Sequence, residues 1–389
     1  MKRILSILTL FIHLAVCCGA HAETDIDPSA QIYEFGIYSI NEFGNVILDV
    51  YGNTFAELGF EYGDVITVDI AGQEYQMPVV SSYSDVDISE MLCRVKTAED
   101  EAQSTVMLAV SNGIFARETG LAEKETIDAD PGYVWHYDED AVITVSMYRK
   151  GGYADQYILH QLNGSTERSD YADLTDEQYA NFRMITTPGI ASYMLYRSSS
   201  PINPALNRNK EADNALNNAG IVSVLNLADS EKGMKAYPDF NETYYAQRNI
   251  LALSMAMDYT DSDFLGKTAK AIRFIAETEG PWLIHCKHGK DRTGFLCAVL
   301  ECLTGADAND VITDYMESYV NLYHLTAGEE KYELIAEKNI VQALQDAFEL
   351  PDIRADGTDL AEGARKYLIK TGLSGEEIDV VMEKLSKGL

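Results

Sequence analysis

The pattern of hydrophobic and polar positions divides most of the chain into two parts. Between residues 31 and 128, short apolar or alternating runs are separated by turns that contain glycine. Runs of this kind are typical of strands, and they lie at 46–50, 64–70, 77–80 and 107–110. We therefore expect residues 31–128 to form a small all-β domain, either a barrel or a sandwich.

Strand and helix patterns alternate in residues 191–389. Helical stretches at 210–219 and 264–277 are interspersed with buried-strand patterns at 220–229 and 250–255. This alternation predicts an α/β fold with a parallel-rich central sheet and helices on both of its faces. The C-terminal stretch has only helical periodicity, so we expect the domain to end in helices.

A transition segment, residues 129–190, is expected between these two domains. It contains one strand pattern at 141–147 and a polar stretch at 163–176. The sequence from Thr175 to Gln178 is typical of a capped helix start.

The first 22 residues have the pattern of a signal peptide. Lys2 and Arg3 precede an apolar core from Ile4 to Val16, and small residues follow at Ala20 and Ala22. Because the core is too short to span a bilayer comfortably, we expect no integral membrane segment after cleavage. The mature protein is then exported, whether secreted, periplasmic or at the cell surface.

The charge of the chain limits its partners. Its 389 residues have a formal net charge of −32. Such a charge disfavours nucleic acid as a partner. It also makes any cluster of basic residues a local feature on an acidic surface.

The cysteines form neither a disulfide framework nor a zinc motif. Cys17 and Cys18 lie in the leader and could accept a lipid, but the residues before them fit that signal poorly. We therefore favour a cleaved signal over a lipoprotein, and we expect no metal and no other cofactor. The remaining cysteines are Cys93, Cys286, Cys297 and Cys302.

Candidate chemistry is concentrated in residues 282–294, which combine a buried strand, a polar loop and the start of an apolar helix. Cys286 follows the strand, Arg292 lies six positions later, and Thr293 and Gly294 come next. A loop at a helix N-terminus directs N–H groups inward and forms an anion site. The same field favours the thiolate of Cys286, which is the nucleophilic form. The planar fork of Arg292 can hold two oxygens of a phosphoryl group.

The order His-Cys, five residues, Arg-Thr-Gly resembles the loop of the cysteine-dependent phosphatases of the bacterial tyrosine and dual-specificity type. Tyr196-Arg197-Ser198 and the later Asn226-Leu227 resemble the opening of the same domains. The resemblance implies a phosphatase domain over residues 191–389 that hydrolyses phosphate monoesters through a phosphocysteine. It implies that Cys286 is the nucleophile and that Arg292 binds the phosphoryl group. The other implied phosphate-binding residues are Lys287, His288, Gly289, Lys290 and Gly294.

Two further catalytic roles have more than one interpretation. Thr293 could donate a hydrogen bond to the Cys286 sulfur or could cap the helix. The leaving oxygen needs a proton from a nearby carboxylic acid. Asp291 is favoured as that acid, because related phosphatases with a similar loop have an aspartate at this place. The alternatives precede the helix that leads to the loop, and they are Asp258, Asp261 and Asp263.

The substrate remains open at this level. A phosphotyrosine protein needs one basic residue beside the loop, whereas the two lysines Lys287 and Lys290 also fit an inositol phosphate or a phosphoinositide. A non-catalytic phosphoanion-binding protein is the alternative from another class. The intact set of Cys286, Arg292 and Thr293 disfavours it, because a binder does not need the thiol.

The β-domain has a diffuse resemblance of its own. Four stretches are similar to the C-terminal β-domain of S-adenosylmethionine hydroxide adenosyltransferases, namely Phe43-Gly44-Asn45-Val46, Gly63-Asp64-Val65-Ile66, Tyr83-Ser84-Asp85 and Ser111-Asn112-Gly113. The partner domain of those enzymes has no counterpart in this chain, so their activity is not implied. The resemblance leaves a nucleoside-binding module as one alternative, and a β-module that accompanies the phosphatase as the other.

Overall fold

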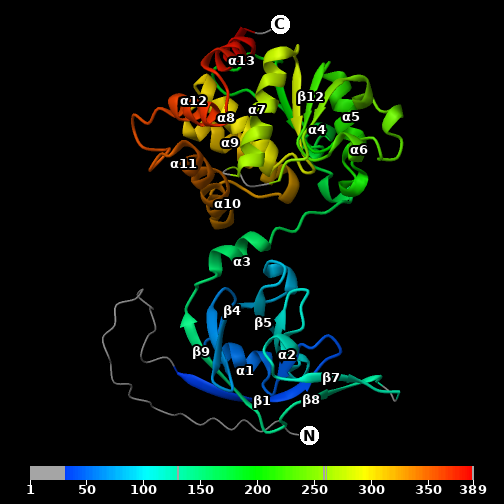
Figure 1. Cartoon of the computed structure of the whole chain (residues 1–389), viewed down its shortest axis with the longest axis vertical. Helices are drawn as coiled ribbons and strands as arrows, with labels where there is room; N and C mark the ends of the chain where they lie inside the picture. Colours follow the sequence, from blue (N-terminus) through cyan, green and yellow to red (C-terminus); the bar gives the residue numbers. More distant parts are fainter. Residues whose placement is uncertain (1–30, 129–130, 257–258, 260, 388–389) are drawn as a thin grey trace. The chain divides into compact units, whose positions relative to one another are not determined.

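A computed structural model describes residues 31–128, 131–256, 259 and 261–387. The chain divides into two compact units, Met1–Leu162 and Asn163–Leu389 (Figure 1). The expected signal peptide, the two leader cysteines Cys17 and Cys18, and the candidate acid Asp258 lie outside the described residues. No helix in the described part of the chain is long and apolar enough to cross a membrane.

The first unit contains a closed barrel of seven strands among its described residues. Neighbouring strands pair antiparallel except β4 and β5, which are parallel. Around the barrel the strands are β1 (Ile32–Ile40), β2 (Val46–Leu48), β6 (Thr105–Val110), β5 (Met91–Lys96), β4 (Gln73–Val80), β3 (Val65–Ile70) and β9 (Val142–Arg149).

Alternation of apolar and polar residues builds the barrel core. In β3, Ile66, Val68 and Ile70 are buried while the residues between them are partly exposed. A short helix, α1 (Gly52–Glu57), adds the fully buried Phe55 to this core. Burial of these side chains is the main term that stabilises the unit.

The barrel closes through β9, which pairs with both β1 and β3. This strand lies beyond residue 128, where the sequence pattern of the β-domain was expected to end. In sequence, β9 is preceded by a separate two-stranded sheet of β7 (Glu123–Thr126) and β8 (Tyr133–His136). Residues 129–190 therefore contribute β9 and α3 (Ala154–His160) to the first unit and the beginning of the second.

The second unit has a five-stranded sheet in the order β10, β11, β14, β12, β13. Four strands are parallel, and only the short edge strand β10 is antiparallel to its neighbour. The strands are β10 (Arg183–Met184), β11 (Leu195–Ser198), β14 (Trp282–His285), β12 (Ser223–Asn226) and β13 (Asn249–Ala252).

Helices pack on both faces of this sheet (Figure 1). On one face, α5 contributes Ala212 and Leu216 to a core that includes Val224 and Leu283. On the other face, α8 contacts β11 and β14. The main helices of the unit are α4 (Asp176–Tyr179), α5 (Asn209–Asn218), α7 (Ser262–Glu277), α8 (Asp291–Thr304), α9 (Ala308–Tyr323), α10 (Glu330–Ala336), α11 (Gln342–Phe348), α12 (Leu360–Lys370) and α13 (Gly375–Lys387).

The α/β fold and the preceding β-rich domain predicted from the sequence are confirmed. The register of the sheet explains where a ligand would bind. His285, the last residue of β14, pairs with Ser198 of β11 and Asn226 of β12. The carboxyl ends of three parallel strands therefore meet at one edge, which is where open α/β sheets bind their ligands.

Candidate active site

The loop between β14 and α8 begins at this edge of the sheet. All four residues of β14 are buried, and Cys286 directly after them is 3% exposed. Helix α8 then begins at Asp291, and its residues from Thr293 to Leu303 are buried. A buried strand and a buried helix thus hold both ends of a five-residue loop.

Glycines allow the tight packing of this loop. Gly289 has a φ of +69°, and a Cβ there would lie 2.1 Å from the Ser198 carbonyl oxygen. A Cβ at Gly294 would lie 2.5 Å from the ring of Tyr315. Only glycine satisfies both the left-handed φ and the backbone contact at position 289.

The described cysteines differ in their surroundings. Burial raises the pKa of the Cys93, Cys297 and Cys302 thiols, so these groups stay protonated. Cys297 and Cys302 lie inside α8, and Cys93 lies in the barrel core. Cys286 alone among the described cysteines lies in a loop at a helix N-terminus.

Arg292 is oriented by the carbonyl groups that follow two other strands. Its Nη1 donates to the Met255 oxygen at 2.9 Å and to the Leu227 oxygen at 3.3 Å. These residues follow β13 and β12. The side chain is half-buried, and both of its hydrogen bonds to described residues start from Nη1, not from Nε or Nη2. Two donors therefore remain for the oxygens of an anion.

The Thr293 hydroxyl is fully buried and has no hydrogen-bond partner among the described residues. The N-cap position of α8 is Lys290, which makes no side-chain cap bond. The capping role considered for Thr293 is therefore wrong. A buried hydroxyl without a partner is costly, and this one lies in the first turn of α8, directly after the loop.

The two histidines of the loop region are neutral at pH 7. Burial lowers the pKa of His285 to about 4, and this ring hydrogen-bonds the Tyr245 hydroxyl at 2.9 Å and the Cys286 oxygen at 3.2 Å. Burial and the neighbouring Lys290 and Lys287 lower the pKa of His288 to about 4. His285 thus supports the loop through hydrogen bonds, and His288 adds no positive charge to it.

Lys290 and Asp291 form an ion pair within the loop. The Lys290 Nζ lies 2.7 Å from Asp291 Oδ1 and 3.1 Å from the Tyr319 hydroxyl. The same hydroxyl lies 3.2 Å from Asp291 Oδ1. Burial would raise the pKa of Asp291, but Lys290 and Tyr319 lower it overall, so the free site contains a carboxylate. Lys287, by contrast, is exposed.

The alternative acids have other partners. Asp261 caps α7, where its carboxylate accepts a hydrogen bond from the Asp263 N–H at 2.8 Å. Asp263 forms an ion pair with Lys267 at 2.6 Å. Both side chains therefore have a local structural role at the start of α7. Among the described residues, no group of three or more His, Cys, Asp or Glu side chains could hold a metal ion.

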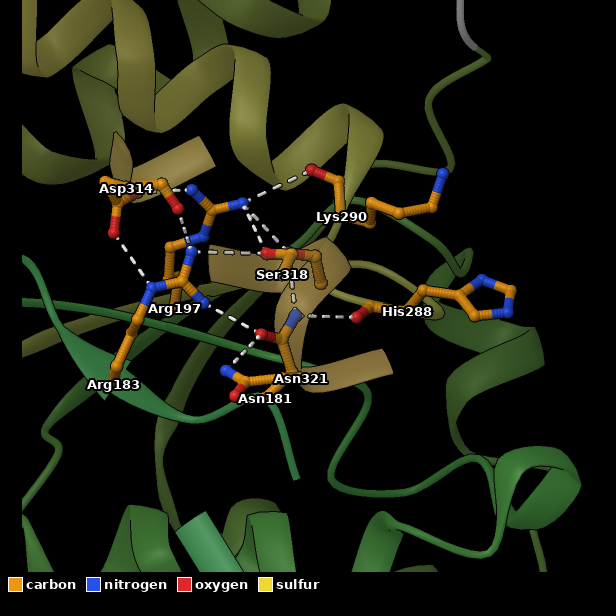
Figure 2. Close-up of polar contacts among 9 residues, drawn as sticks. Asn181, Arg183, Arg197, His288, Lys290, Asp314, Ser318 and Asn321 are labelled. Carbon is orange, nitrogen blue, oxygen red and sulfur yellow. Dashed lines mark hydrogen bonds and ion pairs between the residues drawn. The ribbon is translucent and has the colours of Figure 1, made fainter. Parts of the chain in front are cut away.

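Several residues that contact the loop were not assigned from the sequence. Asn181 Nδ2 donates to the His288 oxygen at 3.0 Å, and Arg197 Nη2 donates to the Gly289 oxygen at 3.0 Å (Figure 2). Arg197 belongs to the Tyr-Arg-Ser stretch that resembles phosphatase domains. That stretch marks the residue as important but does not indicate that it contacts the loop. Asn181 has no recognisable sequence signal.

The tyrosine phosphatase family model matches residues 180–386 of the chain. The fold and the loop define a cysteine-dependent phosphatase of the tyrosine phosphatase type. The chain belongs to the tyrosine phosphatase family. No curated protein sequence matches it.

Three solved structures have low similarity to the chain. TpbA of P. aeruginosa has 19% identity and a TM-score of 0.24, with 49% of this chain and 88% of that chain covered. The catalytic core of the PP-IP phosphatase SIW14 from S. cerevisiae has 19% identity and a TM-score of 0.25, with 44% of this chain and 99% of that chain covered. An uncharacterized conserved protein from Thermotoga maritima has 19% identity and a TM-score of 0.22. The match covers 29% of this chain and only 35% of that protein.

Replacing Lys290 with methionine should raise the pKa of Asp291. The substitution removes the cation that lowers this pKa, whereas the burial that raises it remains. The carbon-13 shift of the Asp291 carboxyl group, followed against pH, measures the change. Lys287→Met is the control, because Lys287 is exposed and is not a cause of the Asp291 shift. An unchanged Asp291 titration in Lys290→Met would contradict the ion-pair account.

Proposed function

We propose that the protein hydrolyses phosphate monoesters of phosphotyrosine proteins through a phosphocysteine intermediate. The observation that supports this most directly is the position of Cys286, at the carboxyl end of the central strand and at the N-terminus of α8. In the first step the sulfur attacks phosphorus and the aryl oxygen leaves with a proton. In the second step water attacks the phosphocysteine and gives a proton to the carboxylate that acted as acid in the first step, and phosphate and the thiolate are released.

Arg292 and the loop N–H groups bind the three non-bridging oxygens and stabilise their charge in both transition states. The hydrogen bonds from Arg292 to Met255 and Leu227 support this role, because they fix the guanidinium before substrate arrives. The buried hydroxyl of Thr293 donates to the Cys286 sulfur when the thiolate leaves phosphorus. This hydroxyl has no hydrogen-bond partner among the described residues, Cys286 included, so its donor is available for that step.

Asp291 is the general acid of the proposed reaction. Asp261 and Asp263 are used at the start of α7, whereas Asp291 lies at the loop itself. In the free site Lys290 keeps Asp291 ionised. A bound phosphoryl dianion brings negative charge beside Asp291 and competes for Lys290, and both effects raise the pKa of this carboxyl group. Asp291 can then hold the proton that the leaving oxygen needs.

The charges beside the loop favour a substrate with one phosphate group. Lys290 is paired with Asp291 and Tyr319, and His288 is neutral. Lys287 therefore remains as the exposed cation of the loop. An inositol phosphate or a phosphoinositide needs several cations and is the less favoured alternative.

We also propose that the protein is exported, because residues 1–22 have the pattern of a signal peptide.

Asp291→Asn should lower kcat/KM about 100-fold on phenyl phosphate and much less on 4-nitrophenyl phosphate. The phenolate needs a proton to leave, whereas 4-nitrophenolate is stable without one. Rates on both substrates are measured for the mature protein under reducing conditions. Asp261→Asn is the matched control and should leave the ratio between the two substrates unchanged.

Four outcomes would contradict this proposal at different points. An equal drop on both substrates would remove Asp291 as the acid, and a selective drop in Asp261→Asn would assign that role to Asp261. Full activity in Cys286→Ser would exclude the thiol mechanism. Phosphate binding without turnover of either substrate by the wild type would favour the non-catalytic phosphoanion binder.

We further propose a nucleoside site in the first unit. A cavity of about 760 Å³ there is lined by residues from three of the four stretches that resemble adenosyltransferases, and by none of residues 63–66. These lining residues are Phe43, Asn45, Tyr83, Asn112 and Gly113. Aromatic side chains and a buried asparagine are suited to stacking on a base and to hydrogen bonding with its edge.

Adenosine should raise the unfolding temperature of the first unit, because a ligand at 100 times its Kd stabilises a fold by about 2.7 kcal/mol. Scanning calorimetry of the mature protein measures the shift. Phe43→Ala should abolish the shift with little change in the ligand-free Tm, since this side chain is 65% exposed. Cys286→Ser should retain it. An equal shift in Phe43→Ala, or none in the wild type, would exclude this site.

A further inference from the structure

We propose that Arg197 is a positioning residue of the phosphate-binding loop, and that it turns the N–H groups of Lys290 and Asp291 toward the substrate phosphoryl group. This inference deepens the proposed phosphatase function and rests on it. Arg197 does not touch the substrate. It acts through the carbonyl groups on the opposite side of the loop.

Arg197 contacts two successive carbonyl groups of the loop. It lies in β11 and is fully buried. Its Nη2 donates to the Gly289 oxygen at 3.0 Å and to the Lys290 oxygen at 3.3 Å (Figure 2). The hydroxyl of Ser318, in α9, lies 3.3 Å from the same nitrogen and 3.4 Å from the Gly289 oxygen.

These bonds fix the directions of the N–H groups because a trans peptide is planar and its C=O and N–H point in opposite directions. The Gly289 carbonyl shares its peptide plane with the Lys290 N–H, and the Lys290 carbonyl shares its plane with the Asp291 N–H. Because the Gly289 carbonyl is turned toward Arg197, the Lys290 N–H points away from it. The Lys290 carbonyl also accepts from the Gly294 N–H at 2.6 Å, so helix α8 and Arg197 together set the direction of the Asp291 N–H. The structure gives no hydrogen bond from the Gly289 or Lys290 N–H to any described residue.

Asn181 extends the same arrangement to a third peptide group. Its Nδ2 donates to the His288 oxygen at 3.0 Å, so the N–H of Gly289 is turned the opposite way. The Asn181 carboxamide is itself held, since its Oδ1 accepts from Arg183 Nη1 at 2.8 Å. Three consecutive N–H groups at the start of α8 are therefore aligned by donors behind the loop.

Asp314 in α9 holds the two arginines in place. Its Oδ2 lies 2.5 Å from Arg197 Nη1, and its Oδ1 lies 2.8 Å from Arg183 Nε. Burial alone would raise the pKa of Asp314, but Arg183 and Arg197 lower it, so it is a carboxylate. Burial and Asp314 raise the pKa of the nearby Glu301, so Glu301 is neutral.

The cluster of Arg183, Arg197, Asp314 and Glu301 therefore contains two guanidinium groups and one carboxylate. Its excess positive charge lies directly behind the loop and adds to the field that attracts an anion. A buried ion pair stabilises a fold weakly or not at all, because both charges are desolvated. Stability therefore does not explain why the fold contains this cluster, whereas orientation of the loop does.

The test measures anion binding separately from turnover. Arg197→Lys is made in the Cys286→Ser protein, and the affinity for tungstate is measured by calorimetry at a temperature where the protein is folded. Lysine keeps the charge, but its single nitrogen cannot take the place of both Nη1, which bonds Asp314, and Nη2, which bonds the two carbonyl groups. We expect the affinity to fall about tenfold or more. In the protein with Cys286 intact, kcat/KM for phenyl phosphate should fall at least as much.

Two further variants separate positioning from general stability. Arg273→Lys is the matched control, because Arg273 also bonds a carboxylate, Glu377 at 2.6 Å, and a carbonyl group, Gly372 at 2.8 Å, away from the loop. It should leave tungstate affinity unchanged. Ser318→Ala is the milder variant if Arg197→Lys fails to fold, and it should weaken binding about threefold.

The amide nitrogen-15 and proton shifts of residues 289–291 give a direct readout. Tungstate should shift all three in the parent protein and shift them less in Arg197→Lys or Ser318→Ala. A loss of Tm with unchanged affinity and unchanged amide response would overturn the positioning role. If the wild type binds tungstate but turns over no phosphate ester, the proposed function fails while the positioning role is still tested. If it binds no anion, both fail.

Discussion

The proposed phosphate site depends on a turn in which the chain passes from β14 into α8 through only five residues. The turn brings the backbone at Gly289 against the backbone of Ser198, so closely that no side chain fits between them. The neighbouring strand β11 also provides Arg197, which bonds the carbonyl groups of the turn. One strand therefore limits both the path of the loop and the direction of its peptide groups.

Electrostatics explains how this site can attract an anion in a protein whose net charge is −32. The helix N-terminus, Arg292 and the buried arginine cluster all act within the site. Surface carboxylates are farther away and are screened by salt. Near the loop, the carboxylate of Asp291 is balanced by Lys290. The local field is therefore positive although the whole molecule is acidic.

The sequence predicted well what depends on local pattern. The helix expected at 264–277 is α7 (Ser262–Glu277), and the one expected at 210–219 is α5 (Asn209–Asn218). The loop from Cys286 to Arg292 was found because its signal is continuous in sequence. Buried apolar runs and helix caps are properties of neighbouring residues, so they can be read without the fold.

What the sequence did not predict depends on long-range pairing. The barrel closes by pairing β1 with β9, a strand more than a hundred residues later. Asn181 contacts the loop from a segment far from it in sequence. Arg183 and Asp314 act behind it through Asn181 and Arg197, and none of the three belongs to a local motif. The ion pair of Asp291 with Lys290 could have been expected from their adjacency. The hydrogen bond from Tyr319 to Asp291 could not have been expected, because it depends on where α9 packs.

The central claim is that Cys286 takes the phosphoryl group from the substrate. It is tested most directly by quenching the mature protein during turnover of a phosphotyrosine peptide and locating the phosphoryl group by mass spectrometry of the digest. The account predicts a phosphoryl group on the peptide that contains Cys286, at a level that falls to zero when the substrate is exhausted. Turnover with no phosphorylated Cys286, or with the phosphoryl group on another residue, would contradict it.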